Sequence, residues 1–299
     1  MAGLREEIKN SFQHGDILTR LILVNLGVFI AYLLIKVVSF LFGVSLHEHL
    51  IDWLALPTDL FTLATRPWTL VTYMFLHQGF FHILFNMLWL YFAGRLFLEY
   101  FGERTLLSTY LMGGLIGGIL YVLAYNIFPS FSDVVSISNN RGASAGVMAI
   151  VIAVATYNPR FPVQLFFVLR VPIWVIGALA LLTDLVYLGD GNNAGGHIAH
   201  LGGAAFGYIL ARRYQDGTNI TDGFSEFLDG LFDWFKTKPK SKKHVKKVFV
   251  NRKSKSSPES KKEAFDQARV DKILDKIRVS GYDSLSKDEK DYLFKIGQD

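Results

Sequence analysis

The chain of 299 residues has no cysteine and few charged residues, and both shortages narrow what it can be. Without cysteine it can form no disulfide, use no cysteine nucleophile and bind no metal through thiolates. Only 19% of its residues are charged, whereas 51% are hydrophobic and 25 are phenylalanine. Because soluble proteins of this length are less apolar and richer in charge, the composition indicates an integral membrane protein.

Long apolar runs recur through the first two thirds of the chain, and they are about 20 residues long, enough to cross a bilayer as helices. We predict an all-α fold, a polytopic bundle of six transmembrane helices followed by a small helical cytosolic tail. The first run has no small-residue cleavage site, so we expect it to be an uncleaved span. The predicted spans cover residues 19–42, 70–93, 105–127, 143–158, 163–188 and 197–213.

Basic residues predict the orientation of this bundle. Most of them fall at the start of the chain, in the second and fourth connections and after the sixth span, while the other connections are richer in acidic residues. The positive-inside rule then places both termini in the cytoplasm. We expect a multi-pass protein of a bacterial inner membrane. The basic residues concerned are Arg5, Lys9, Arg20, Arg95, Arg104, Arg160, Arg212 and Arg213.

This topology gathers the unusual polar residues of the bundle at one depth near the outer face. Ser144 opens the fourth span, and His197 and His200 open the sixth. The second span also enters from outside and carries His82 and Asn86, which share one helix face because they are four residues apart. Polar and ionisable side chains inside a bilayer are costly and usually functional.

Each of these residues has a structural explanation when it is taken alone. Ser144 could be a helix cap or a small packing residue, and His200 could be a core histidine bonded to a carbonyl. Asn86 could join two helices through a hydrogen bond. Their convergence at one depth favours a functional site over these separate explanations.

The residue types suit acyl transfer. A serine hydroxyl is a weak nucleophile that needs a neighbouring base, and histidine titrates in the right range. Side chains of His82 and Asn86, with the Ser144 backbone N–H at a helix start, could form an oxyanion hole. We expect a Ser144–His200 dyad without an orienting acid, because no Asp or Glu is expected at this depth.

Glycines are expected to support this arrangement. Gly142 leaves the backbone before Ser144 uncrowded, and Gly203 and Gly207 form a small-residue face on the sixth span. Such a face lets two helices approach closely, as a hydrogen bond between the fourth and sixth spans requires.

Three stretches, "HQGFFHILFNMLWLY", "RGASAGVM" and "HLGGAAFG", resemble the three signatures of the rhomboid family of intramembrane serine proteases. The resemblance covers roughly residues 15–213. It implies a serine endopeptidase, a hydrolase of intramembrane proteolysis that cleaves transmembrane or juxtamembrane segments of other membrane proteins. It also implies no cofactor and no metal, with protein substrates and membrane lipid as partners and no nucleic acid. The matched residues are His77, His82, Asn86, Gly142, Ser144, His200, Gly203 and Gly207.

Other functions remain open at this point. The chain could be a catalytically inactive rhomboid-like protein that binds client helices, although both serine and histidine are present. A metalloprotein could use His77, His82, His197 and His200, but it would lack a carboxylate at that depth. A transporter would be expected to show an inverted repeat, which the sequence does not suggest. For a protease, the glycine- and asparagine-rich residues 188–196 are expected to form a lid.

The whole chain divides into four predicted regions, and the first is a membrane domain over residues 1–213. Residues 214–236 are expected to form an amphipathic helix that lies on the inner interface or packs on the bundle. Residues 237–262 are expected to be a basic, disordered linker that could touch anionic lipid. Residues 263–299 should form a small helical hairpin, with Gly281 ending one helix and a Ser286–Glu289 capping box opening the next.

Overall fold

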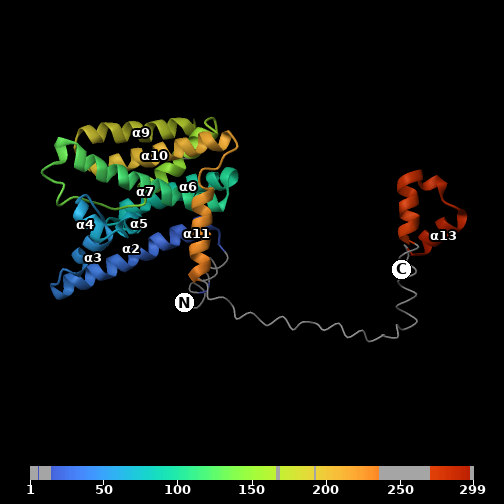
Figure 1. Ribbon diagram of the computed structural model, residues 1–299, viewed down its shortest axis with the longest axis horizontal. Coiled ribbons are helices and arrows are strands. Elements are labelled where there is room, and N and C mark those ends of the chain that lie inside the picture. Colours follow the sequence, from blue (N-terminus) through green and yellow to red (C-terminus); the bar gives the residue numbers. More distant parts are fainter. Residues whose placement is uncertain (1–5, 7–14, 166–168, 192, 236–269, 297–299) are drawn as a thin grey trace. The chain divides into compact units, whose positions relative to one another are not determined.

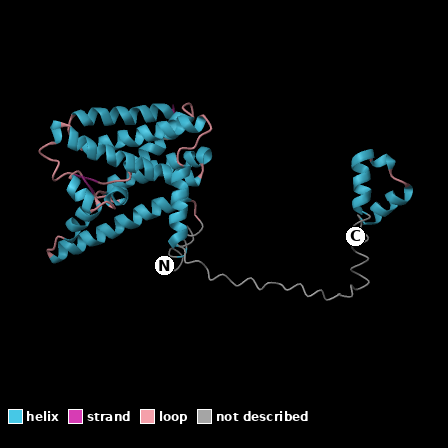
Figure 2. Ribbon diagram, viewed as in Figure 1, coloured by secondary structure: helices cyan, strands magenta, loops and turns pink. Residues whose placement is uncertain are grey.

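The computed structural model describes residues 6, 15–165, 169–191, 193–235 and 270–296 (Figure 1). These residues are mostly helical, with a few short strands (Figure 2). The chain falls into two compact units, Met1–Thr237 and Lys238–Asp299. The candidate site lies in the first unit.

Three helices of the first unit are long and apolar enough to cross a membrane: α2 (Ile17–Phe42), α6 (Phe80–Phe101) and α7 (Glu103–Ile127). Two shorter apolar helices are α8 (Ser144–Tyr157) and α9 (Ile173–Gly189). The sixth, α10 (Ala194–Gln215), has 22 residues but a lower apolar content. The helices support an integral membrane protein, and three of the six predicted spans meet both length and hydropathy requirements within the described residues.

Short elements join these helices. Four short helices and one strand lie between α2 and α6. The strand, β1, pairs antiparallel with β2. A second antiparallel pair, β3 with β4, precedes α9. The elements are α3 (Leu46–Leu54), β1 (Leu56–Pro57), α4 (Leu60–Thr65), α5 (Thr69–Thr72), η1 (Tyr73–Phe75), η2 (Pro129–Phe131), β2 (Asn139–Asn140), β3 (Pro162–Leu165) and β4 (Leu169–Pro172).

Two predicted spans were wrong at their first residues. The second, predicted over 70–93, is helix α6 and begins at Phe80, because the apolar residues before it form short turns that stop before Gly79. The fifth, predicted over 163–188, begins only at Ile173, because the preceding apolar residues pair as the β3–β4 hairpin. The four other predicted spans each coincide with a helix to within a few residues.

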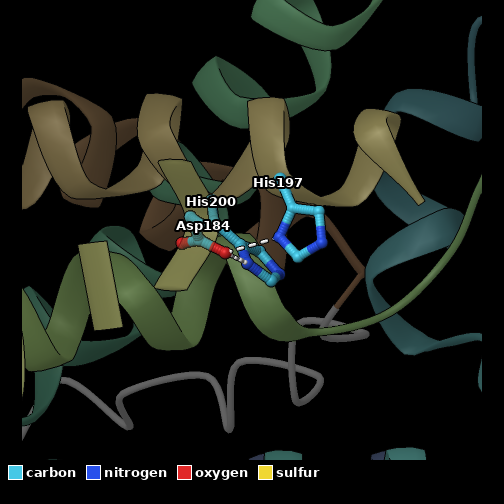
Figure 3. Close-up of side chains that lie close together, drawn as sticks. All are labelled: Asp184, His197 and His200. Atoms are coloured by element: carbon cyan, nitrogen blue, oxygen red, sulfur yellow. Dashed lines mark hydrogen bonds and ion pairs between the residues drawn. The ribbon is translucent and has the colours of Figure 1, made fainter. Parts of the chain in front are cut away.

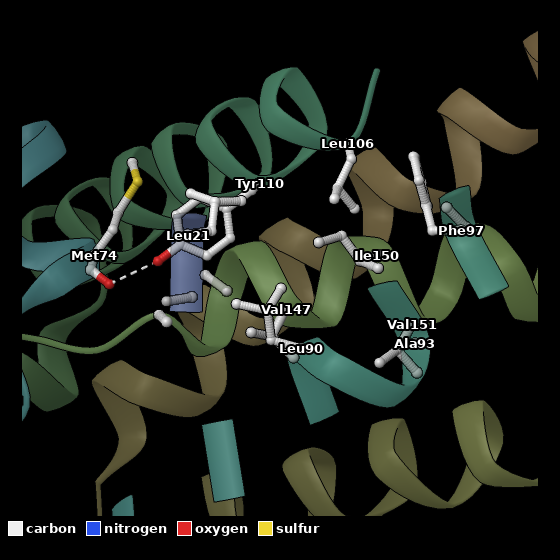
Figure 4. Packing of buried hydrophobic residues seen from close by; sticks show 14 of the residues in the cluster. Leu21, Met74, Leu90, Ala93, Phe97, Leu106, Tyr110, Val147, Ile150 and Val151 are labelled. Atoms are coloured by element: carbon white, nitrogen blue, oxygen red, sulfur yellow. Dashed lines mark hydrogen bonds between the residues drawn. The ribbon is translucent and has the colours of Figure 1, made fainter. Parts of the chain in front are cut away.

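Helix α8 lies at the centre of the bundle, with ten of its fourteen residues buried. Its neighbours α6, α7 and α10 close around it, and aliphatic and aromatic side chains of α6, α7 and α8 interlock in the core (Figure 4). Glycines set the close approach of α10. A Cβ atom at Gly203 or Gly207 would collide with the backbone carbonyl of Ala145 or Ala149 on α8. The predicted close contact between the fourth and sixth helices is therefore present.

Helix α11 (Asp222–Phe235) belongs to the first unit and contacts α7. The hydroxyls of Ser225 and Ser108 lie 2.8 Å apart in a buried hydrogen bond, and Asp229 forms a 3.2 Å ion pair with Arg104. Of the two placements expected for this amphipathic helix, the contacts show packing on the bundle. The predicted linker over 237–262 lies outside the described residues.

The described part of the second unit, residues 270–296, contains two helices joined by a turn, within the range 263–299 where a helical hairpin is predicted. Residues 270–280 are helical, Gly281 follows with a φ of 76°, and η3 (Tyr282–Ser284) leads to α13 (Lys287–Ile296). The Ser286 N–H donates to Glu289 Oε2 at 2.8 Å, and the Glu289 N–H donates to Ser286 Oγ at 3.3 Å. The capping box is thus confirmed, and it is reinforced by a 2.8 Å ion pair from Lys276 on the preceding helix to Glu289.

Candidate active site

Ser144 is the first residue of α8, and the loop before it is fixed by two backbone hydrogen bonds. The Gly142 N–H donates to the carbonyl of Tyr73 at 2.9 Å, and the Ala143 N–H donates to His77 Nε2 at 3.3 Å. The φ of Gly142 is 132°, a conformation that favours glycine. The first N–H groups of a helix have no acceptor within that helix, so the Ser144 N–H is available to an oxyanion.

His77, which forms one of these hydrogen bonds, is fully buried. Its Nε2 accepts from Ala143, and its Nδ1 lies 3.4 Å from the carbonyl oxygen of Phe75. An acceptor at Nε2 and a carbonyl at Nδ1 together require the neutral ring with its proton on Nδ1. The imidazole that the sequence assigned a supporting role therefore contacts the residue next to Ser144.

His82 and Asn86 lie on one face of α6, as predicted from their spacing. The Asn86 amide donates to the His82 carbonyl at 2.8 Å, and its second N–H remains for another acceptor. A Cβ atom at Gly142 would lie 2.8 Å from His82 Nε2 and 3.7 Å from Ser144 Oγ. The His82 ring and the serine hydroxyl thus flank the same glycine, and a larger residue there would displace His82.

Ser144, His200, His82 and Asn86 line one cavity of about 760 Å³. Helix α9 contributes the largest share of the remaining wall, including Ile176, Leu179, Ala180, Thr183 and Tyr187. The structure therefore brings the candidate nucleophile, the candidate base and both oxyanion candidates to one space, with an apolar side formed by a peripheral helix. Among the described residues no hydrogen bond joins the Ser144 hydroxyl to His200 in this state. Catalytic hydrogen bonds are often loose without substrate.

A carboxylate at this site corrects the expectation of a dyad without an acid. Asp184 on α9 is 3% exposed, and its Oδ1 atom lies 2.8 Å from Nδ1 of His200 and 2.7 Å from Nδ1 of His197 (Figure 3). The residue stands in the C-terminal half of α9, beside the N-terminal half of α10. Because the two helices run in opposite directions, an acid near the end of one meets histidines near the start of the other.

The three residues Asp184, His197 and His200 also form a group that could hold a metal ion, since their ligand atoms lie within 4.8 Å of one another. The alternative of a four-histidine metal set does not match this grouping: His197 and His200 come together with a carboxylate, whereas His77 bonds to Ala143. Both imidazoles direct Nδ1 at the same carboxylate oxygen, and hydrogen bonds account for that geometry.

A family model of the rhomboid domain matches residues 64–215, about half of the chain. RHOMBOID-like protein 12, mitochondrial, from Arabidopsis thaliana is 30% identical over 210 residues, which cover 68% of this chain and 59% of that protein. Rhomboid-like protein 16, chloroplastic, from the same plant is 28% identical over 167 residues, which cover 51% of this chain and 50% of that protein. The chain spans about half to three fifths of the length of these relatives. By its motifs and by the matched domain, the chain belongs to the rhomboid family.

Proposed function

We propose that this protein is an intramembrane serine endopeptidase that cleaves transmembrane or juxtamembrane segments of other membrane proteins. The observation that supports this most is the meeting of Ser144, His200, His82 and Asn86 around one cavity within a helical bundle. Three separate helices, α6, α8 and α10, would have little reason to present these side chains to the same space if each were only structural. Family membership points to the same chemistry.

In the proposed reaction, His200 Nε2 takes the proton of the Ser144 hydroxyl as its oxygen attacks the scissile carbonyl. The resulting oxyanion accepts hydrogen bonds from the Ser144 N–H and from the side chains of His82 and Asn86. The His200 imidazolium then gives its proton to the leaving amine, and the peptide bond breaks to leave an acyl-serine. Water, deprotonated by the same imidazole, releases the carboxylate product and restores the hydroxyl.

The cavity favours a hydrophobic substrate segment. Its α9 wall is largely apolar, and α9 also exposes Leu182 and Leu185 outside the cavity. A helical substrate keeps its carbonyls in hydrogen bonds, so cleavage should favour small or helix-breaking residues at an unwound stretch. Residues 188–196, which run from the end of α9 to the start of α10, would act as a lid, and motion of α9 would admit the segment.

We place the protein in a membrane with both termini in the cytoplasm and the site open to the opposite side, as the basic residues suggest. A bacterial inner membrane fits that orientation. The relatives are named as mitochondrial and chloroplastic proteins, so an organelle membrane is the alternative location.

The second candidate function is a catalytically inactive rhomboid-like protein that binds client helices. The observation that favours it is the lack of a hydrogen bond between Ser144 and His200 among the described residues. Labelling with a fluorophosphonate separates the two functions, because the reagent reacts only with an activated serine. We expect the wild type and the Ser136→Ala control, an exposed serine, to be labelled, and the Ser144→Ala variant to remain unlabelled. Absence of labelling in the wild type would favour the binding protein.

A further inference from the structure

We infer that Asp184 is the positioning residue of the site: it holds His200 in the tautomer and orientation in which Nε2 is the base. The inference rests on the proposed function for its kinetic test, but its structural content concerns only the bond between α9 and α10. It adds an acid to a site for which serine and histidine alone were expected.

The direction of the hydrogen bond fixes the tautomer. An ionised carboxylate only accepts hydrogen bonds, so the 2.8 Å contact between Asp184 Oδ1 and His200 Nδ1 places a proton on Nδ1. In a neutral imidazole the lone pair then lies on Nε2, the atom that must receive the serine proton. The opposite tautomer would direct the Nδ1 lone pair at a carboxylate, and the two would repel.

Because Asp184 is buried, its carboxylate costs folding free energy, so packing alone does not explain its presence. Asp184 is 3% exposed, its Oδ1 atom has two imidazole donors, and its Oδ2 atom has no hydrogen-bond partner among the described residues. A buried, incompletely satisfied charge generally destabilises a fold relative to an apolar side chain of similar size. A role in orienting the base supplies a reason for keeping it.

His197 and His200 both donate to this oxygen, but their surroundings separate their roles. Gly203, three residues after His200, lies against the carbonyl of Ala145, so this turn of α10 is the one beside Ser144. His197 stands one turn earlier, and its ring stacks on Tyr187 with centroids 5.8 Å apart. We therefore assign His200 as the base and His197 as the second donor that stabilises the Asp184 charge.

The test compares Asp184→Asn with Asp133→Asn, the same chemical change at an exposed position between η2 and β2. Full-length proteins are reconstituted in liposomes, and cleavage of a single-span reporter gives kcat and KM. We expect Asp184→Asn to lower kcat by about 100-fold or more, the usual contribution of a correctly placed base, with KM changed less than about twofold because the cavity wall keeps its shape. Asp133→Asn should match the wild type.

A purely structural role for Asp184 would lower activity only in proportion to the loss of folded protein. Thermal unfolding and ¹⁵N-histidine NMR on the same samples exclude that case. We expect a single Nδ1–H signal for His200 in the wild type and its loss or exchange broadening in Asp184→Asn. An Asp184→Asn protein that is folded and cleaves with the wild-type kcat would overturn the inference.

Two further arms separate the remaining outcomes. Activity that is abolished by a chelator and restored by zinc would mean that Asp184, His197 and His200 bind a metal, and would overturn the inference. If the wild type cleaves no better than Ser144→Ala, the proposed function fails. The NMR measurement, made on the Ser144→Ala protein, then still decides whether Asp184 fixes the His200 tautomer.

Discussion

The Nε2 atom of His77 accepts a hydrogen bond from the backbone N–H of Ala143 at 3.3 Å, and the two residues lie 66 positions apart in the chain. The bond ties the loop before α6 to the residue that immediately precedes Ser144. Because His77 is fully buried, no water can replace it as the acceptor for that N–H. The position of the candidate nucleophile therefore depends on a histidine that does not itself line the cavity.

Replacing His77 by phenylalanine should leave the Ala143 N–H without an acceptor, at a cost of about 1–3 kcal/mol in the free energy of unfolding. The loop before Ser144 should also shift, so that kcat falls by about tenfold or more, because small misplacements of reacting groups are expensive. Thermal unfolding and reporter cleavage measure the two effects. His49→Phe, at an exposed histidine of α3, is the control. Unchanged stability and activity in His77→Phe would show that this bond does not position the loop.

Removing the Asn86 amide should weaken the oxyanion hole. We expect Asn86→Ala to lower kcat by about 100- to 1,000-fold, or about 2.7–4 kcal/mol, because the donor acts mainly in the transition state. KM should change little for the same reason. Asn126→Ala is the control: its amide donates to the carbonyls of Thr58 and Val122, so its loss should lower stability without lowering kcat. A kcat for Asn86→Ala within twofold of wild type would remove Asn86 from the oxyanion hole.

The contact between α10 and α8 predicts a strong effect of one methyl group. A Cβ atom at Gly203 would collide with the Ala145 carbonyl, whereas one at Gly27 on α2 would meet nothing within 4 Å. Gly203→Ala should therefore destabilise the protein by about 1–3 kcal/mol through overpacking. Gly27→Ala should be neutral or stabilise it by up to about 1 kcal/mol, since alanine favours helix. Thermal midpoints in detergent make the comparison; equal midpoints for the two variants would contradict the close helix contact.

The sequence predicted most of the bundle because its apolar runs and its motifs are both local signals. Helices α2, α7, α8 and α10 lie where long or small-residue-rich apolar runs occur. The starts of α6 and α9 were misplaced because hydropathy does not distinguish a span from apolar turns or from a β-hairpin. Whether such a run starts a helix depends on local pairing, such as the antiparallel pairing of β3 with β4.

Asp184 could have been found from the sequence, because an ionisable residue inside a predicted span is itself a functional signal. The predicted site drew on residues at the starts of the spans predicted to enter from outside, whereas Asp184 stands near the end of a span predicted to enter from inside. An antiparallel neighbour brings such a residue to the same depth. The two hydrogen bonds that join His197 and His200 to one carboxylate oxygen depend on side-chain geometry, which no rule of sequence spacing supplies.

The capping box of the second unit gives a pH-dependent prediction. Hydrogen bonds from Lys276 and from the Ser286 N–H lower the pKa of Glu289 from 4.5 to about 2. A carboxyl whose pKa is lowered by folding stabilises the fold above its ordinary pKa, and this contribution is lost as the pH falls from about 4.5 to about 2. Glu289→Gln should therefore speed amide exchange in residues 287–296 of the full chain at pH 7, but not near pH 2.

Hydrogen–deuterium exchange followed by mass spectrometry measures this difference at each pH. Asp275→Asn is the control, because Asp275 and Arg278 form a loose, exposed pair at 3.7 Å that should contribute little. If Glu289→Gln exchanged like the wild type at pH 7, the charge of Glu289 would have no measurable effect on this helix.

The most direct test of the whole account is cleavage of a single-span reporter by purified, reconstituted protein, compared between wild type, Ser144→Ala and Ser136→Ala. We expect wild type and Ser136→Ala to cut the reporter within or beside its transmembrane segment at equal rates, and Ser144→Ala to leave it intact. Cleavage by Ser144→Ala at the wild-type rate would contradict the assignment of Ser144 as the nucleophile.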